Sequence, residues 1–424
     1  MQPTPTEKLT TANITDIMQT ADVGFSASVA IHPSYPRTDN VAHLTYRQKT
    51  NLGSFYTPPR LVCLLYDVIA RNIPANSADT VLESACGYGA FFAEKFPQPN
   101  ARLIGADIDS DALAIARRQF PKITIFNANA LAQISRAKYG IRDNERLIII
   151  GNPPYNDVTS HVKNRIKAAP CEIDASVRTR DLGLSFLLAA AKLSPDYIAL
   201  LHPLSYLIKE TNFKILAPLM RDYSLRDAVV FNSQEFAETS KGCGFPIVAA
   251  VYAKNSSGTT YEQIRHRQFR TIEGSSFSIS DYDYVSRYIT KYPTRFPSTP
   301  SHEAHFRFYT MRDINALKRS RTFITEDTAN AIHIIPEKLP YYCYVDAFKD
   351  IAGTLPYYLG NLDIMINHPA FEPLKNDFLT VSVAKHPAIF STHFSAPDTT
   401  HLRAAQEAVR HYFKKLFQNI KPCS

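Results

Sequence analysis

The sequence contains no tryptophan, and no two of its six cysteines are spaced as Cys-x-x-Cys. Neither a zinc site built on such a pair nor a dithiol redox motif is therefore expected. The patterns G-x-x-x-x-G-K-[ST] and G-x-S-x-G are also missing, which argues against an ATP-driven motor and an α/β-hydrolase. His302-Glu-Ala-His305 is one residue shorter than the zinc-binding pattern H-E-x-x-H. We expect no bound metal.

Long hydrophobic runs are missing as well. The most apolar stretch, Tyr197–Ile208, contains His202 and Pro203 and is too short to cross a bilayer. The first ten residues, MQPTPTEKLT, have neither a basic n-region nor an apolar h-region, so we expect no signal peptide. These features predict a soluble protein of the reducing cytoplasm that has no membrane partner.

The 424 residues are 45% apolar, which is enough for well-buried cores in two or three domains. The net charge of +8 and the pI of about 9.0 favour a polyanionic partner, although many basic proteins bind no nucleic acid. Tyrosine and phenylalanine make up the aromatic 11%, and such side chains among basic ones suit base stacking.

Short apolar runs alternate with helical stretches between about residues 51 and 254. Such alternation predicts an α/β fold, in which helices cover both faces of a mainly parallel sheet. The expected strands are Thr80–Ala85, Leu103–Asp107, Ile123–Phe126, Leu147–Ile150, Tyr197–Leu201, Ala228–Phe231 and Ile247–Ala253. The expected helices between them include Ser110–Phe120 and Leu182–Leu193.

The polar break Asn255-Ser-Ser-Gly-Thr-Thr ends this unit in our interpretation. We divide the chain into an N-terminal arm (1–45), an α/β domain (46–254) and a second domain (255–424). In the second domain, Tyr341–Tyr344 and Leu362–Ile366 are expected as strands, and His401–Phe417 as an amphipathic helix. This pattern indicates an α+β domain.

The strongest local motif is Asn152-Pro-Pro-Tyr155, which directly follows the apolar strand Leu147–Ile150. Open parallel sheets bind their ligands at the carboxyl ends of their strands. Each proline fixes φ and removes an N–H, so the segment is stiff and offers carbonyl acceptors. Asn152 adds an amide oxygen, and Tyr155 adds a flat ring on which a base can stack.

Two further strand ends carry chemistry. Gly87 and Gly89 follow the strand that begins at Thr80, and they allow a tight turn into a helix close to a ligand. Glu83 at that strand end suits the amino group of an amino-acid moiety. Asp107 ends the next strand, where acidic side chains usually bind ribose hydroxyls. Asp109 or Ser110 is the expected cap of the helix that follows.

Together these motifs resemble the gamma group of adenine-N6 DNA methyltransferases. The chain has Gly53-Ser-Phe-Tyr-Thr-Pro-Pro59, then Glu83–Gly89, then Asp107, then Asn152–Tyr155, which is the order of that group. The resemblance covers about half of the chain, from residue 51 to 254. It implies a Rossmann-like S-adenosylmethionine-dependent methyltransferase domain, followed by a C-terminal α+β target-recognition domain that binds double-stranded DNA.

The resemblance also implies roles for individual residues. Asn152, Pro153, Pro154 and Tyr155 form the catalytic loop, and an aromatic side chain in a later loop stacks on the second face of the flipped base. Phe236 fits that place best and Phe245 is the second choice, while a buried core position is the alternative for either. The cofactor S-adenosylmethionine is expected to contact Tyr56, Thr57, Pro58, Glu83, Ala85, Gly87, Asp107, Ile108 and Asn129. The family usually has Asp at the last of these positions.

Methylation of adenine N6 requires help, because the lone pair of this nitrogen is delocalised into the ring. The Asn152 side-chain oxygen and the Pro153 carbonyl can accept both N6 hydrogens and so free the lone pair. Positioning then supplies much of the rate. The base must leave the duplex to reach this loop, and aromatic faces offset the stacking that it loses.

Basic clusters are the expected contacts to DNA phosphates, with a solvated charged face as the alternative for each cluster. The candidates are Lys163, Arg165, Arg265, Arg267, Arg270, Lys318 and Arg319. By resemblance, the setting is a restriction–modification system with a possible cognate endonuclease. Two alternatives stay open: an N-methyltransferase acting on RNA adenine or a protein glutamine amide, and a non-catalytic DNA-binding subunit.

Overall fold

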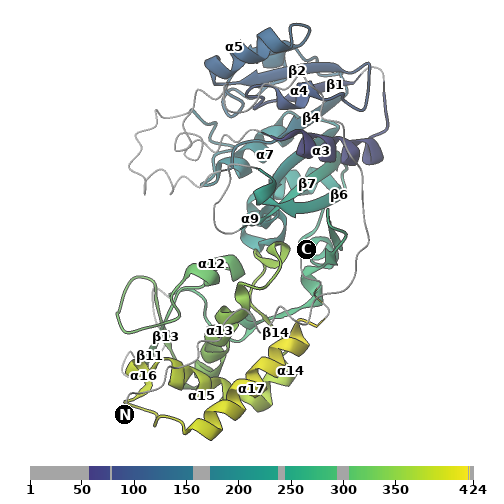
Figure 1. Ribbon diagram of the computed structural model, residues 1–424. Helices are drawn as coiled ribbons and strands as arrows, with labels where there is room; N and C mark the ends of the chain where they lie inside the picture. The colour runs from purple at the N-terminus through teal and green to yellow at the C-terminus, as the bar shows by residue number, and fades with distance from the viewer. Residues whose placement is uncertain are drawn as a thin grey trace. The chain divides into compact units, whose positions relative to one another are not determined.

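A computed structural model describes residues 57–76, 79–155, 172–236, 244–293, 305–418 and 420. Among these residues, nine strands form one central sheet in the order β3-β2-β1-β4-β5-β7-β6-β8-β9. Figure 1 labels β1, β2, β4, β6 and β7 of this sheet. The strands are β1 (Thr80–Glu83), β2 (Arg102–Asp107), β3 (Thr124–Asn127), β4 (Leu147–Gly151), β5 (Tyr197–Pro203), β6 (Tyr223–Asn232), β7 (Pro246–Lys254), β8 (Phe269–Thr271) and β9 (Ser276–Phe277). The predicted N-terminal arm, 1–45, lies outside the described residues.

Strands β1 to β5 pair in parallel with one another, and β7 runs antiparallel between β5 and β6. This is a doubly wound, Rossmann-like α/β sheet, and the predicted fold class is confirmed. All seven strands expected before residue 254 are present, with ends that differ by a few residues. The apolar runs identified them because a strand buried on both faces is apolar along its length.

Side chains alternate along each strand, so the sheet has two packed faces. Val81 and Ile148 belong to the apolar cluster of one face, together with α3 (Pro59–Asn72). Leu82 and Ile149 belong to the cluster of the other face, together with α7 (Leu182–Lys192). Other helices of this part are α4 (Ala90–Ala93), α5 (Ser110–Gln119), α8 (Ser205–Ile208), α9 (Glu210–Ile215), α10 (Ala217–Asp222) and α11 (Tyr261–His266).

Local signals explain where the helices begin. Asp109 caps α5 by accepting hydrogen bonds from the backbone amides of Asp111 and Ala112, as the sequence analysis anticipated for Asp109 or Ser110. Asp181 caps α7 in the same way. Helix α3 has proline at its first position, where no backbone N–H is required. Thr57 and Asp109 thus stand at helix starts that face the carboxyl ends of the strands.

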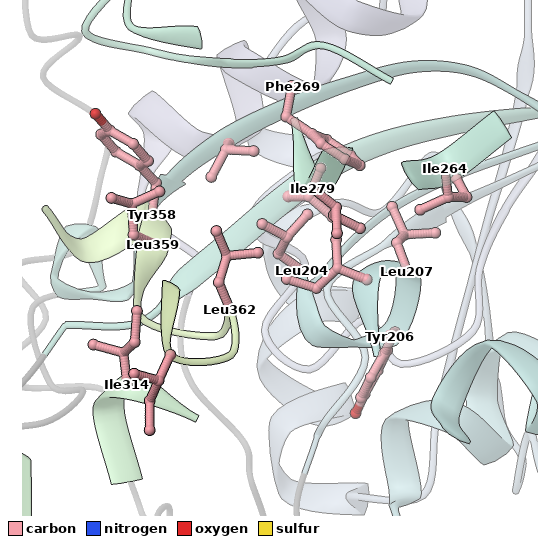
Figure 2. Close-up of a cluster of buried hydrophobic side chains, with 14 of the residues drawn as sticks. Leu204, Tyr206, Leu207, Ile264, Phe269, Ile279, Ile314, Tyr358, Leu359 and Leu362 are labelled. Atoms are coloured by element: carbon pink, nitrogen blue, oxygen red, sulfur yellow. The ribbon is translucent and has the colours of Figure 1, made fainter. Parts of the chain in front are cut away.

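Strand β7 ends at Lys254, where we placed the end of the α/β domain. The sheet nevertheless continues beyond that residue, because β8 pairs in parallel with β6 and β9 pairs with β8. Buried side chains from both sides of the boundary belong to one apolar cluster. Figure 2 shows part of it, with Leu204 and Leu207 near β5, and Ile314 and Leu362 from the C-terminal part.

The C-terminal part combines helices with small antiparallel sheets. Its strands are β10 (Asp283–Tyr284), β11 (Phe306–Tyr309), β12 (Phe323–Ile324), β13 (Ala331–Ile334) and β14 (Met365–Ile366). Its helices are α12 (Ile314–Arg319), α13 (Leu339–Ala352), α14 (His368–Phe371), α15 (Lys375–Lys385), α16 (Pro387–Phe390) and α17 (Thr399–Leu416). Helix α17 confirms the expected amphipathic helix, with Ala405, Val409 and Phe413 buried.

One predicted strand is wrong. Tyr341–Tyr344 lies in α13, where Tyr342 and Tyr344 are fully buried. A run of aromatic residues is typical of strands by local propensity, but here the Tyr344 ring packs against α15 and α17, and tertiary contacts override propensity. Of the other expected strand, Leu362–Ile366, only Met365 and Ile366 pair, with β10.

Helices α13 and α15 are joined by a buried charge. Asp346 has no exposed surface, and its carboxylate contacts His386 at 3.0 Å and Lys385 at 3.4 Å. Burial raises the pKa of Asp346, but the hydrogen bond with His386 and the charge of Lys385 outweigh this and lower it below its usual value. The ion pair therefore stabilises the fold above the pKa of an unfolded aspartate.

We expect Asp346→Asn to destabilise the protein by about 1.5–3 kcal/mol at pH 7, because it replaces a buried carboxylate that accepts charge-assisted hydrogen bonds. Since the folded pKa is depressed, the difference from wild type should shrink as the pH falls through it. Thermal unfolding of both proteins at pH 7, 5 and 3 measures this. Equal melting temperatures at pH 7 would show that the pair does not stabilise the fold.

Candidate active site

Three neighbouring strands end in the residues predicted to bind ligands. Glu83 at the end of β1 pairs with Gly105 of β2 on one side and with Ile150 of β4 on the other. Asp107 ends β2, and Asn152 directly follows β4. The sheet order places β1 between β2 and β4, so residues 24 to 69 positions apart in sequence meet at one edge of the sheet. This is the edge at which doubly wound folds bind ligands.

Glu83 is a buried carboxylate, with 3% of its surface exposed. Its Oε2 atom has no hydrogen-bond partner among the described residues. Burial, and then the nearby charge of Asp107, raise the pKa of Glu83 well above its usual value. Gly151 of β4 lies beside this side chain and has a φ of +142°, a backbone conformation that favours glycine. A buried carboxylate oxygen without a hydrogen-bond partner is costly, and a strongly perturbed pKa is typical of a functional site.

The glycine turn is tied to Asp107. The Gly87 amide donates to Asp107 Oδ2 at 2.8 Å, and the Asp109 amide donates to Oδ1 at 3.0 Å. Burial raises the pKa of Asp107 although these hydrogen bonds lower it. Gly87 and Gly89 have φ of +48° and +83°, a backbone conformation that favours glycine. The Asp107 carboxylate thus orders the glycine turn and lies at the carboxyl end of β2.

Asn152 is held by the segment before α3. Its Nδ2 donates to Thr57 Oγ1 at 3.2 Å, and Thr57 is itself buried. Nδ2 is thus the end of the amide that faces Thr57, and Oδ1 is the opposite end. Asn152 Oδ1 is then buried without a hydrogen-bond partner among the described residues. The site therefore offers a preoriented neutral acceptor at the end of β4.

The rest of the loop is packed in place. Pro153 is buried, and Pro154 and Tyr155 are half-buried. The Tyr155 ring packs against the apolar clusters of both sheet faces. Its hydroxyl is buried without a partner in the described part of the chain, and burial raises the pKa of Tyr155 above its usual range. Tyr155 is therefore positioned by packing of its ring.

A hollow adjoins these residues. It is lined by Ser84, Ala85, Ile149, Ile150, Gly151, Asn152, Pro153, Phe186, Ala190 and Leu200. Ala85, Asn152 and Pro153 were predicted site residues, whereas Phe186 and Ala190 on α7 were not. The available signal was the helical pattern after residue 181, which placed α7 next to the sheet but did not show which of its residues faces the strand ends.

Ile108, the predicted neighbour of a cofactor adenine, is 58% exposed. Pro58 is the N-cap residue of α3, next to Thr57. Asn129 is already engaged: its Nδ2 donates to the Glu172 carbonyl at 2.7 Å, and its Oδ1 accepts from the Leu131 amide at 2.9 Å. Its contact to the cofactor stays a prediction. Tyr56 lies outside the described residues.

Phe236, the predicted second stacking residue, is buried in the core of the sheet. Phe236 is 1% exposed and packs on Phe231, with 6.0 Å between ring centroids. This is the buried core position that was the expected alternative for this residue. Phe245 is half-buried against the same cluster. Stacking of either ring on a base stays a prediction.

The side chains predicted to bind phosphates differ in their partners within the protein. Arg265 contacts Glu262 at 3.2 Å, and exposed Arg270 lies 3.6 Å from Asp227. Arg267 donates to the backbone carbonyls of Leu225 and Arg226, so it fastens the segment before β8 to β6. Lys318 and exposed Arg319 end α12. Lys163 and Arg165 lie outside the described residues.

Within the described residues, no group of three or more His, Cys, Asp or Glu side chains is arranged to hold a metal ion. No helix in these ranges is both long and apolar enough to cross a membrane.

Comparison with known proteins gives only distant structural likenesses. No family model matches the chain, and no curated protein matches it. Solved structures that are similar include a class I S-adenosylmethionine-dependent methyltransferase described as putative from Listeria monocytogenes (13% identity, 50% of this chain and 62% of that one, TM-score 0.35). Others are an RNA methyltransferase, also described as putative, from Pyrococcus horikoshii (15%, 49% and 89%, 0.32) and TrmN from Thermus thermophilus (21%, 46% and 49%, 0.30).

The match spans less than two thirds of the Listeria protein, and all three TM-scores are below 0.5. We therefore base the assignment of the fold on the strand order and pairing of this chain.

Proposed function

We propose that this protein transfers a methyl group from S-adenosylmethionine to the N6 amino group of adenine in double-stranded DNA. The observation that carries the proposal is the buried Asn152 Oδ1, which has no hydrogen-bond partner among the described residues, while the Nδ2 of the same amide donates to Thr57. An amide oxygen fixed in this way accepts a hydrogen bond from an N–H and cannot donate one. It suits an amino group as substrate.

The cofactor site is supported by a second group without a partner. Glu83 Oε2 is a buried acceptor that suits the ammonium of the methionine part, and Asp107 is the residue for the ribose hydroxyls. Gly87 keeps the turn free of a side chain, and nothing lies within 4 Å of the place where its Cβ would stand. When bound, S-adenosylmethionine supplies a methyl group on a sulfonium centre. The donor set of the chain fits this molecule.

The residues of the chain then act on the amino group. Asn152 Oδ1 and the Pro153 carbonyl accept the two N6 hydrogens, which draws the lone pair out of conjugation with the ring. Tyr155 holds the flipped base by stacking. The bound cofactor would supply its methyl group to this nitrogen, and the substituted nitrogen would release one proton to solvent. Positioning and preorganised acceptors lower the barrier, and no strong base is required.

DNA is proposed as the substrate on the ordered set of motifs and on the net charge of +8. The residues of the loop itself suit any planar amino group, so RNA adenine and a protein glutamine amide present the same chemistry. A restriction–modification system with a cognate endonuclease is the proposed setting. Residues 255–424 are proposed as the target-recognition domain, where base edges are read.

The test is transfer of labelled methyl from S-adenosylmethionine to unmethylated genomic DNA, total RNA and protein extract in parallel, followed by nucleoside and amino-acid analysis. We expect label in N6-methyladenine of the DNA only. Label in RNA adenine or in glutamine would overturn the DNA assignment. If calorimetry detects no binding of S-adenosylhomocysteine, the protein is a non-catalytic subunit and the proposal is wrong.

A further inference from the structure

The first turn of α7 lies next to the Cβ atom of Tyr155. Asp181 caps this helix by accepting from the backbone amides of Gly183, at 2.9 Å, and Leu184. Gly183 is buried, and a Cβ on it would lie 2.8 Å from Tyr155 Cβ and 2.5 Å from the Tyr206 hydroxyl. Real Cβ atoms do not approach other atoms so closely. Gly183 therefore occupies a place that has no room for a side chain, directly behind the stacking tyrosine.

The other side of this contact is rigid. Tyr206 is 1% exposed, and its hydroxyl donates to Asp181 Oδ1. Figure 2 shows this hydroxyl pointing away from the apolar cluster around Leu204 and Leu207. The tyrosine is thus anchored at its tip by the helix cap and along its ring by packing. It cannot give way cheaply if the glycine gains a methyl group.

Behind Tyr206 lies a buried histidine. His202 stacks on Tyr206 and on Tyr252, with ring centroids 5.7 and 6.0 Å away. Burial lowers the pKa of His202 to about 4, so the ring is neutral at pH 7. Its Nδ1 hydrogen donates to the Pro203 carbonyl at 3.0 Å, and its Nε2 accepts from the Tyr252 hydroxyl at 2.8 Å. A continuous stack therefore supports the Asp181–Gly183 turn from the sheet.

We propose that Gly183 and Tyr206 are positioning residues for the catalytic loop. Close packing at Gly183, which Tyr206 limits on its other side, determines the position of Tyr155. This inference rests on the proposed function for its effect on catalysis, but the placement itself is independent of the reaction. Displacement of Tyr155 changes how a flipped base is held. It leaves Glu83 and Asp107, which lie on other strands, unaffected.

The kinetic test compares wild type with Gly183→Ala and Tyr206→Phe. We expect a loss of roughly tenfold in kcat, since small displacements in an active site are costly, with unchanged affinity for S-adenosylhomocysteine in calorimetry. Gly353→Ala is the matched control, because nothing lies within 4 Å of a Cβ at that position. Equal loss of cofactor affinity and kcat in Gly183→Ala and Tyr206→Phe would indicate a general structural defect and overturn the proposal.

A second test does not depend on activity. The chain has no tryptophan, so Tyr155→Trp introduces a single fluorescent reporter at the loop. Combined with Gly183→Ala, the emission should move to longer wavelength and acrylamide should quench it more, whereas the combination with Gly353→Ala should match Tyr155→Trp alone. Identical spectra in all three proteins would overturn the proposal. If wild type methylates nothing, the proposed function fails, and this measurement still decides the placement of Tyr155.

Discussion

Replacement of Asn152 by alanine should lower methyl transfer at least about 100-fold, which is the size of effect expected when one preorganised group that stabilises the transition state is removed. The reason is the buried Oδ1 atom, which the Thr57 hydroxyl orients through the other end of the amide. Alanine leaves the amino group of the substrate without this acceptor. Single-turnover transfer of labelled methyl to DNA measures the chemical step directly.

Cofactor affinity should be nearly unchanged in Asn152→Ala, because Glu83 and Asp107 are the residues proposed to hold S-adenosylmethionine. Asn152→Asp is the informative companion variant. It keeps an acceptor oxygen, and its second oxygen can accept from the Thr57 hydroxyl, so part of the activity should remain. A wild-type rate in Asn152→Ala would show that the Asn152 oxygen does not contribute to methyl transfer and would contradict the proposed function.

The second large effect is expected at Glu83. Glu83→Gln should weaken binding of S-adenosylhomocysteine about 10- to 100-fold, because hydrogen bonds to charged groups contribute about 1.5–3 kcal/mol. The amino group of the ligand is cationic, and only the ionised carboxylate pairs with it. Isothermal titration of both proteins at pH 7 measures the difference.

The pH dependence of this binding follows from burial. Since the pKa of Glu83 is raised well above its usual value, the free protein keeps its proton to a higher pH than an exposed glutamate does. Affinity in the wild type should therefore fall as the pH is lowered through that raised pKa. In Glu83→Gln the same decline should be absent. A pH-independent wild-type affinity would show that Glu83 does not pair with the ligand.

Glu83 should also make the stability of the free protein depend on pH, in the direction opposite to that of ligand affinity. A raised pKa in the folded state means that folding binds a proton, so the stability of the free protein falls as the pH rises through that pKa. Glu83→Gln removes the buried charge, and its melting temperature without ligand should exceed that of wild type at neutral pH. Glu326→Gln is the control: this side chain is 57% exposed beside Arg321, and exposed ion pairs contribute little.

Local sequence signals determined much of the α/β part of this protein. Uniform apolar runs identified the buried strands, since both faces of the sheet are covered. The cap at Asp109 and the stiff Asn152–Tyr155 loop were also predictable, because proline geometry and capping are properties of a few neighbouring residues. The order of the strands was not, although it decides that Glu83, Asp107 and Asn152 share one edge.

Other features depended on contacts between distant residues. Tyr341–Tyr344 looks like a strand by composition but is helical, and its Tyr344 ring packs against α15 and α17. The placement of Phe236 in the core and the hydrogen bonds of Arg267 to β6 likewise follow from tertiary packing.

The difference between what the sequence determines and what the tertiary structure determines is clearest at the loop Asn152–Tyr155. The sequence by itself determined that Asn152 and Tyr155 form a stiff, acceptor-rich segment after a buried strand. Only the tertiary structure decided that Thr57, 95 positions earlier, accepts from the Asn152 amide, and that Gly183 lies next to both Tyr155 and Tyr206. Local patterns specify backbone geometry, whereas the direction of a buried polar atom depends on which distant side chain reaches it first.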